Sequence, residues 1–145
     1  MPPPAVPAAS LFKVKVDVPV RWGDMDALGH VNNACYLTFF ESGRIAYFDV
    51  GPDLRLEQEG ATPVLAHAEV DYLRSVEYPA TLEVRVRVVR VGTTSLEWEH
   101  LVLDKANGEP VAFGKAVLVS YDLKKRQKAP LSASVRARVR EVDGL

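Results

Sequence analysis

The chain has 145 residues, of which 48% are apolar and 26% are charged, and its net charge at pH 7 is −1. This length and composition are typical of one globular domain with an ordinary hydrophobic core. The near-neutral charge argues against nucleic acid or a membrane surface as the main partner, and no stretch approaches the ~20 apolar residues that span a bilayer. The single cysteine, Cys35, excludes an internal disulfide, so we expect a reducing, cytoplasmic location.

The start of the chain is rich in proline and alanine and lacks the charged and apolar regions of a signal peptide. We therefore predict a disordered tail over residues 1–10 and one domain over residues 11–145. From Phe12 to Arg21, apolar and polar side chains alternate strictly, which predicts a strand with one buried face. Because Pro19 cannot donate a ladder hydrogen bond, this strand is expected at an edge of its sheet.

Polar residues are concentrated in the stretch Arg21–Asn33. It holds two carboxylates, Asp24 and Asp26, together with two glycines, one histidine and two asparagines. An apolar helix is predicted directly behind it, and helix N-termini present unpaired N–H groups and the positive end of a dipole. The junction between strand and helix is therefore the expected functional site.

The predicted helix runs from about Asn33 to Asp49 and carries aromatic side chains around most of its circumference. A helix this apolar is expected to be largely enclosed. Gly43 in its middle lowers helix propensity, which favours a close backbone approach there. The Gly51-Pro52 pair is expected to end the helix, and a short second helix is predicted from Asp53 to Glu59.

Beyond residue 60 the apolar pattern changes to period two and predicts four further strands, near residues 64–73, 82–88, 96–102 and 111–122. Their short connections, which include an Asn107-Gly108 hairpin signal, favour antiparallel neighbours. The last strand has one face of small residues around Gly114, which would let another element approach closely. Ser132 is expected to open a short C-terminal helix.

These elements predict an α+β fold in which a long antiparallel sheet of about five strands curls around one central helix. Several strands are partly apolar on both faces, and a chain of this length has few layers to cover a second face. We therefore expect a homo-oligomer, most simply a two-fold dimer with sheets joined or stacked, with a homotetramer as the alternative.

The stretch from Asp26 through His30-Val31-Asn32-Asn33 to Tyr36, which continues to Glu41, resembles the hotdog-fold acyl-CoA thioesterases. Within them it is most similar to the 4-hydroxybenzoyl-CoA thioesterase-like family, and the resemblance covers about residues 13–123. It implies the hotdog fold, with the C-terminal helix as an addition. It also implies hydrolysis of an acyl- or aroyl-CoA to free acid and coenzyme A, at an active site that lies on a dimer interface.

The resemblance implies that Asp26 acts as nucleophile or general base and that backbone N–H groups at the helix start form an oxyanion hole. The N–H groups of about Val31 to Asn33 are the expected donors. Helix N–H groups supply such donors without a metal or cofactor, and neither is expected. Asp24 is expected to be structural, and His30 to orient the loop or contact substrate rather than transfer protons. The predicted site has Asp26 as the catalytic residue and Gly29, His30, Val31, Asn32, Asn33, Tyr36 and Glu41 as oxyanion or substrate-binding residues.

Other interpretations stay open. The chain could be a non-catalytic acyl-CoA-binding module of the same fold, or an enoyl-thioester hydratase. The alternation of His67, Glu69 and Asp71 on one strand face is weak evidence for a metal site. The basic stretch Lys124–Lys128 is either a solvated turn or a surface that attracts the phosphates of coenzyme A. The acyl group, and the choice between coenzyme A and an acyl carrier protein, are not determined by the sequence.

Overall fold

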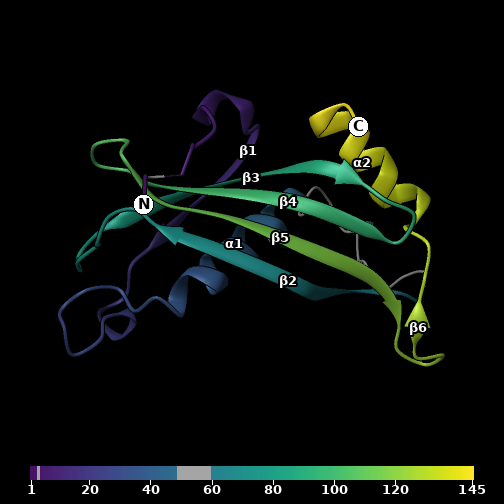
Figure 1. The fold of residues 1–145 in the computed structure, drawn as a ribbon, viewed down its shortest axis with the longest axis horizontal. Helices are drawn as coiled ribbons and strands as arrows, with labels where there is room; N and C mark the ends of the chain where they lie inside the picture. The colour runs from purple at the N-terminus through teal and green to yellow at the C-terminus, as the bar shows by residue number, and fades with distance from the viewer. Residues whose placement is uncertain (3, 49–59) are drawn as a thin grey trace.

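A computed structural model describes residues 1–2, 4–48 and 60–145. The predicted helix end at Gly51-Pro52 and the predicted helix Asp53–Glu59 lie outside these residues. The described elements, in chain order, are η1 (Ala9–Leu11), β1 (Val14–Pro19), η2 (Trp22–Asp24), α1 (Cys35–Phe48), β2 (Thr62–Tyr72), β3 (Thr81–Val91), β4 (Ser95–Asp104), β5 (Pro110–Asp122), β6 (Gln127–Lys128) and α2 (Ala133–Asp143) (Figure 1). None of the helices in the described residues is long and apolar enough to cross a membrane.

The strands form one antiparallel sheet in the order β1-β3-β4-β5-β2, and the short β6 pairs with the end of β5. β1 and β2 therefore lie at the two edges, which confirms the edge position predicted from Pro19. β2 pairs with β5 along its length, from Thr62 opposite Tyr121 to Tyr72 opposite Ala112. Its other edge makes no ladder with any strand that the structure describes.

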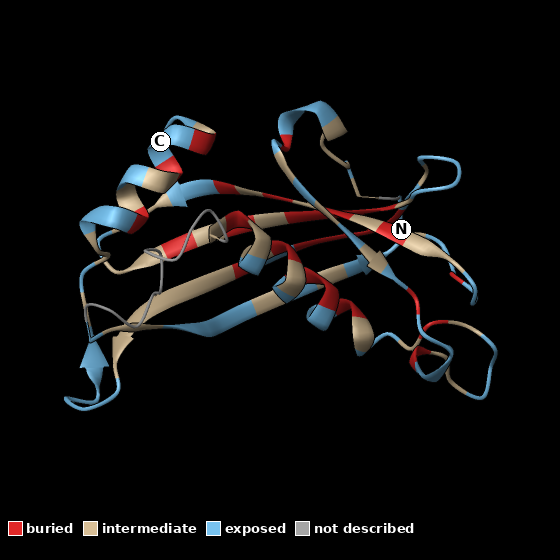
Figure 2. Cartoon of the chain, turned by 180° about the vertical axis from the view of Figure 1, so that it is seen from behind, coloured by how far each residue is buried: buried red, intermediate tan, exposed pale blue. Residues whose placement is uncertain are grey.

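α1 lies across the concave face of this sheet, as the sequence predicted. It buries Tyr36, Phe39, Phe40, Gly43 and Tyr47 against the sheet. The prediction of a largely enclosed helix holds for one side only, because Leu37 and Ile45 are 41% and 60% exposed in the single chain. Figure 2 shows this alternation of buried and exposed residues along the helix, which arises because the sheet covers only one side of it.

Two glycines set how closely α1 approaches the sheet. A Cβ at Gly43 would lie 2.4 Å from Val86 Cγ1, and a Cβ at Gly114 would lie 2.3 Å from Phe40 Cε2. The close approaches predicted at both positions are therefore present. They hold α1, and with it the loop that precedes the helix, in one position on the sheet.

α2 begins where the sequence predicted. The Val135 N–H donates to Ser132 Oγ at 3.2 Å, which satisfies a first-turn amide. Val135, Val139 and Val142 are buried against the core.

The convex face of the sheet carries a second apolar cluster. Phe12, Leu101, Leu103 and Phe113 form it, and Val6 and Ala9 pack against it. Arg85 donates from Nη1 to the Ala9 carbonyl at 3.0 Å, which fixes this contact further. Part of the proline-rich segment thus covers the sheet, while the division into a tail and a domain at residue 10 stays a prediction.

Candidate active site

The loop between β1 and α1 is held by a buried carboxylate. Asp24, 2% exposed, accepts from the Arg21 backbone N–H at 2.8 Å and from the Arg21 guanidinium at 2.7 and 3.0 Å. The hydrogen bonds from Arg21 hold the pKa of Asp24 below its ordinary value. The Asp24 carbonyl also accepts the Asn32 N–H at 2.8 Å, so this residue ties both ends of the loop together. These contacts agree with the structural role expected for Asp24.

Asp26 lies in a tight turn within the same loop. Its backbone N–H donates to the His30 carbonyl at 3.0 Å, and its carbonyl accepts the Gly29 N–H at 3.1 Å. Gly29 has φ +82°, which L side chains rarely adopt, so glycine suits this turn. One carboxylate oxygen of Asp26 accepts the Leu28 N–H at 2.9 Å. Within the described residues, the other carboxylate oxygen of Asp26 accepts no hydrogen bond.

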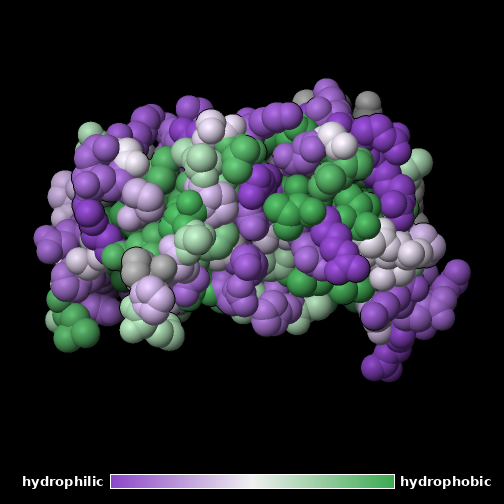
Figure 3. Space-filling view, turned by 45° about the horizontal axis from the view of Figure 1, so that its top comes forward, coloured by the Kyte–Doolittle hydropathy of each residue, from purple (hydrophilic) through white to green (hydrophobic). Residues whose placement is uncertain are grey.

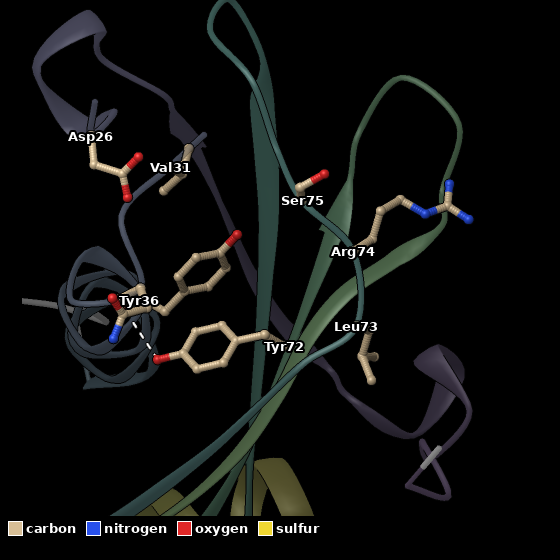
Figure 4. Close-up of a pocket in the computed structure, with 8 residues that line it drawn as sticks. Asp26, Val31, Tyr36, Tyr72, Leu73, Arg74 and Ser75 are labelled. Carbon is tan, nitrogen blue, oxygen red and sulfur yellow. Dashed lines mark hydrogen bonds between the residues drawn. The ribbon is translucent and has the colours of Figure 1, made fainter. Parts of the chain in front are cut away.

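Asp26 lines a pocket of about 340 Å³. The loop and α1 contribute Asp26, Val31, Asn33 and Tyr36, while the end of β2 and the segment after it contribute Tyr72, Leu73, Arg74 and Ser75. In Figure 4, Asp26 and Tyr36 point toward a common space, whereas the Arg74 side chain points away from Asp26. Arg74 instead forms an ion pair with Glu109. The pocket therefore joins the N-terminus of α1 to the free edge of the sheet.

The backbone N–H groups at the helix start differ in availability. The Val31 N–H donates to the Val76 carbonyl at 2.8 Å and the Asn32 N–H donates to Asp24, so both are occupied. Asn32 Oδ1 accepts the Ala34 N–H at 2.9 Å, which closes a tight turn directly before the helix. Within residues 1–2, 4–48 and 60–145, the Asn33 N–H has no backbone or side-chain acceptor. Among the three predicted oxyanion donors, Asn33 is thus the one whose N–H is free for a ligand.

Two tyrosines form the wall of the pocket opposite Asp26. The rings of Tyr36 and Tyr72 pack edge to face with centroids 5.2 Å apart. The Tyr72 hydroxyl donates to the Asn33 carbonyl at 3.0 Å, drawn as a dashed line in Figure 4. Tyr36 is 3% exposed, and burial raises its pKa to about 12, so its hydroxyl stays protonated at neutral pH. It is a hydrogen-bond donor on the pocket wall.

The structure brings some of the predicted site residues together and leaves others apart. Asp26, Val31, Asn33 and Tyr36 line the pocket. Gly29, His30, Asn32 and Glu41 do not line it. His30 Nε2 lies 3.6 Å from Glu77 Oε1, and Glu41 is exposed on α1.

The four pocket residues after position 71 were missed by sequence reasoning. Nothing in their spacing relates them to a loop about 40 positions earlier. The aromatic residue at the end of the β2 alternation, Tyr72, was the one signal available.

No group of three or more histidine, cysteine, aspartate or glutamate side chains that could hold a metal ion occurs in the part of the chain that the structure describes. His67 and Glu69 approach each other to 3.7 Å on β2, but both are more than half exposed.

Comparison with known proteins assigns this fold and motif to a family. The model of the thioesterase-like superfamily matches residues 20–139. A thioesterase from Thermus thermophilus, whose crystal structure contains coenzyme A and Zn, is 44% identical, with a TM-score of 0.77 over 92% of this chain and 96% of that one. The PA2801 protein of Pseudomonas aeruginosa is 33% identical, with a TM-score of 0.80 over 88% of this chain and 98% of that one.

The matches to two curated relatives cover a smaller share of those proteins than the matches to the solved structures do. YsmA of Bacillus subtilis (strain 168), an uncharacterized protein, is 34% identical over 102 residues, which are 70% of this chain and 68% of YsmA. The chloroplastic acyl-acyl carrier protein thioesterase ATL2 of Arabidopsis thaliana is 23% identical over 114 residues, 77% of this chain. The match spans 61% of the length of ATL2.

Proposed function

Because the chain belongs to the thioesterase-like superfamily and is a hotdog-fold thioester hydrolase, we propose that its substrate is an acyl- or aroyl-CoA, which it hydrolyses to the free acid and coenzyme A. The observation that carries the proposal is that the half-buried Asp26 and Asn33, which lies at the start of α1, line the same pocket. A carboxylate and an N–H donor on the same pocket are the two groups that acyl transfer needs.

In the nucleophilic route, the free oxygen of Asp26 attacks the thioester carbonyl carbon, and the carbon–sulfur bond breaks to release coenzyme A as a thiolate that takes a proton from water. The resulting mixed anhydride is then cleaved by water, which restores the carboxylate. In the general-base route, Asp26 takes a proton from water as that water attacks the same carbon. The carbon–sulfur bond then breaks, and the proton passes from Asp26 to the departing coenzyme A thiolate, which restores the carboxylate. The bond from Leu28 N–H at 2.9 Å would hold the carboxylate in one orientation in either route.

The oxyanion that develops on the carbonyl needs donors aimed at it. The Asn33 N–H is proposed as the main backbone donor, and it gains from the positive end of the α1 dipole. The Tyr72 hydroxyl, bonded to the Asn33 carbonyl at 3.0 Å, would steady this residue. The aromatic walls, Tyr36 and Tyr72, are proposed to contact the acyl or aryl group beside the reacting carbon.

Coenzyme A, rather than an acyl carrier protein, is the proposed carrier. The Thermus thermophilus thioesterase that contains coenzyme A is 44% identical to this chain, whereas the acyl carrier protein thioesterase ATL2 is 23% identical. The higher identity and the nearly full coverage favour the Thermus thermophilus protein as the guide to the carrier.

We further propose that the protein acts as a homodimer joined through β2. Val64 and Leu65 are 40% and 45% exposed and, as neighbours on a strand, point to opposite faces of the sheet. Among the residues that the structure describes, β2 therefore exposes apolar side chains on both faces of the sheet. The backbone N–H and C=O groups on its outer edge pair with no described strand. An edge of this kind readily pairs with a second copy. The pocket lies at the end of the same strand, so pairing would place it at the interface.

The proposal is tested by thiol release from a panel of acyl-CoA and aroyl-CoA thioesters, followed with a thiol-reactive dye. We expect turnover with at least one of them, and Asp26→Asn should lower kcat by on the order of 10²-fold or more, the usual scale for a positioned acid–base group. Asp17→Asn, which neutralises an exposed carboxylate on β1, is the matched control and should leave turnover unchanged. Unchanged turnover in the Asp26→Asn variant would remove this residue from the mechanism.

A further inference from the structure

The β5–β6 hairpin carries a cluster of cations that the proposed chemistry does not use. Lys124, Lys125, Arg126 and Lys128 are all exposed, in a protein whose net charge is −1. Among the described residues, their one ion pair joins Lys125 to Asp122 at 4.0 Å. The backbone of the turn is nevertheless ordered, because the Lys124 and Lys125 N–H groups both donate to Asp122 Oδ1 at 2.9 Å. Figure 3 shows a hydrophilic projection at this corner of the molecule.

The hairpin cannot reach the pocket of its own chain. It extends from Tyr121, which lies opposite Thr62 at the start of β2, whereas the pocket lies at Tyr72 at the other end. Ten residue steps along a strand separate these positions by about 33 Å. Figure 1 shows β6 and the loop that holds Asp26 at opposite ends of the sheet. The pantetheine arm of coenzyme A has about 13 bonds between sulfur and phosphorus and spans roughly 17 Å when extended.

Two-fold pairing of β2 edges changes this distance. Strands related by a two-fold axis perpendicular to the sheet run antiparallel, so the start of β2 in one copy lies beside the end of β2 in the other. Within the partner subunit, only β5 separates β2 from β6, which is about 10 Å in the plane of the sheet. In the partner subunit, the turn of the hairpin also projects past the start of β2. In the dimer, this is the direction of the first subunit's pocket. A pantetheine arm that leaves the pocket would then reach the partner's cations.

We propose that the hairpin Lys124–Lys128 of one subunit binds the phosphates of the coenzyme A whose thioester lies in the other subunit's pocket. This inference rests on the proposed function and on the β2 dimer, and it makes each site composite, with the carboxylate from one copy and the phosphate-binding cations from its partner. Clustered cations attract phosphate groups and raise the local concentration of an anionic ligand.

The first test compares substrates with and without phosphates. Lys124→Ser/Arg126→Asn removes two cations, and asparagine tolerates the φ of +55° at position 126. We expect the KM for acyl-CoA to rise by roughly 5- to 10-fold with kcat unchanged. The KM for the matching acyl-pantetheine, which has no phosphate, should not change. Lys13→Ser/Arg140→Ser, which removes two exposed cations elsewhere, is the matched control and should affect neither substrate.

The second test asks which copy supplies the cations. Two differently tagged chains are co-purified as a mixed dimer, one with Asp26→Asn and an intact hairpin, the other with an intact Asp26 and the hairpin variant. The single working site then has its own hairpin altered and its partner's hairpin intact, and we expect the low KM of the wild type. A mixed dimer of wild type with a chain that carries both changes should show the high KM.

Several outcomes separate the inference from the proposed function. An unchanged acyl-CoA KM in the hairpin variant, an equal rise with acyl-pantetheine, or an effect with acyl carrier protein alone would overturn phosphate binding by the hairpin. A high KM in the first mixed dimer would overturn its action across the interface. Coenzyme A binding, measured by calorimetry, should weaken in the hairpin variant by the same factor as KM. That readout needs no turnover, so failure of the proposed hydrolysis would be seen separately as the absence of thiol release.

Discussion

Replacing Gly114 by alanine tests how closely α1 is required to approach the sheet. The added Cβ would lie 2.3 Å from Phe40 Cε2 and 2.6 Å from the Glu69 carbonyl oxygen. Carbon atoms in contact prefer about 3.5–4.0 Å, so the ring would have to retreat by more than ~1 Å. Phe40 has no exposed surface and stacks on His100 with centroids 4.5 Å apart, and the Glu69 oxygen belongs to the neighbouring strand. Neither neighbour can move freely, so we expect a loss of about 2–3 kcal/mol in the free energy of unfolding.

For a chain of this size the loss corresponds to a fall in Tm of roughly 5–10 °C. Thermal and urea unfolding, followed by circular dichroism, measure it. Gly23→Ala is the matched control, because nothing lies within 4 Å of a Cβ at Gly23. In a double-mutant cycle, Phe40→Leu should cost less in the Gly114→Ala background than in the wild type, because the smaller side chain relieves the clash. Equal Tm values for Gly114→Ala and Gly23→Ala would refute the reasoning. Because Phe40 lies one helical turn after Tyr36, we also expect Gly114→Ala to lower kcat/KM.

Three further substitutions address the loop, the pocket wall and the C-terminal helix. Asp24→Asn should lower Tm at neutral pH. The pKa of Asp24 in the folded protein is depressed, so the stability that its ionised form contributes is present above the unfolded pKa and is lost as pH falls through the folded pKa. The difference in unfolding free energy between wild type and variant should therefore shrink on acidification. A difference that stays constant with pH would contradict the role of the ionised carboxylate. Tyr72→Phe removes the bond to the Asn33 carbonyl and should lower kcat with little change in Tm, whereas an effect on Tm alone would assign it a structural role. Ser132→Ala should cost about 1 kcal/mol in urea unfolding through the lost helix cap, and Ser10→Ala, at an exposed serine far from α2 in sequence, is its control.

Much of the architecture follows from local pattern. Period-two alternation predicted β1 to β5, and the inability of Pro19 to donate a ladder bond predicted that β1 is an edge strand. The glycines at positions 43 and 114 indicated where helix and sheet approach closely, because only a missing Cβ allows that approach. The loop from Asp26 to Asn33 was recognisable because its residues are contiguous, so their spacing survives in the sequence.

The other half of the pocket could not be read in the same way. Tyr72 and its neighbours join Asp26 only because β2 is added to the far edge of the sheet, next to β5, which brings its end to the N-terminus of α1. Pairing between strands that are distant in sequence depends on the whole topology rather than on any local signal. The packing of Val6 and Ala9 on the convex face depends in the same way on a surface built by β4 and β5.

The sequence by itself thus determined the strands, the central helix and the family motif, because periodicity and contiguous spacing are properties of the chain alone. Tertiary structure decided which donors are free. The N–H groups of Val31 and Asn32 look equivalent to that of Asn33 in sequence, yet two of the three are occupied by the Val76 and Asp24 carbonyls. It also decided that the basic hairpin lies a full strand length from its own pocket, since the direction of β5 beside β2 places its end there. Hydrogen-bond partners and distances of this kind exist only once the chain has folded.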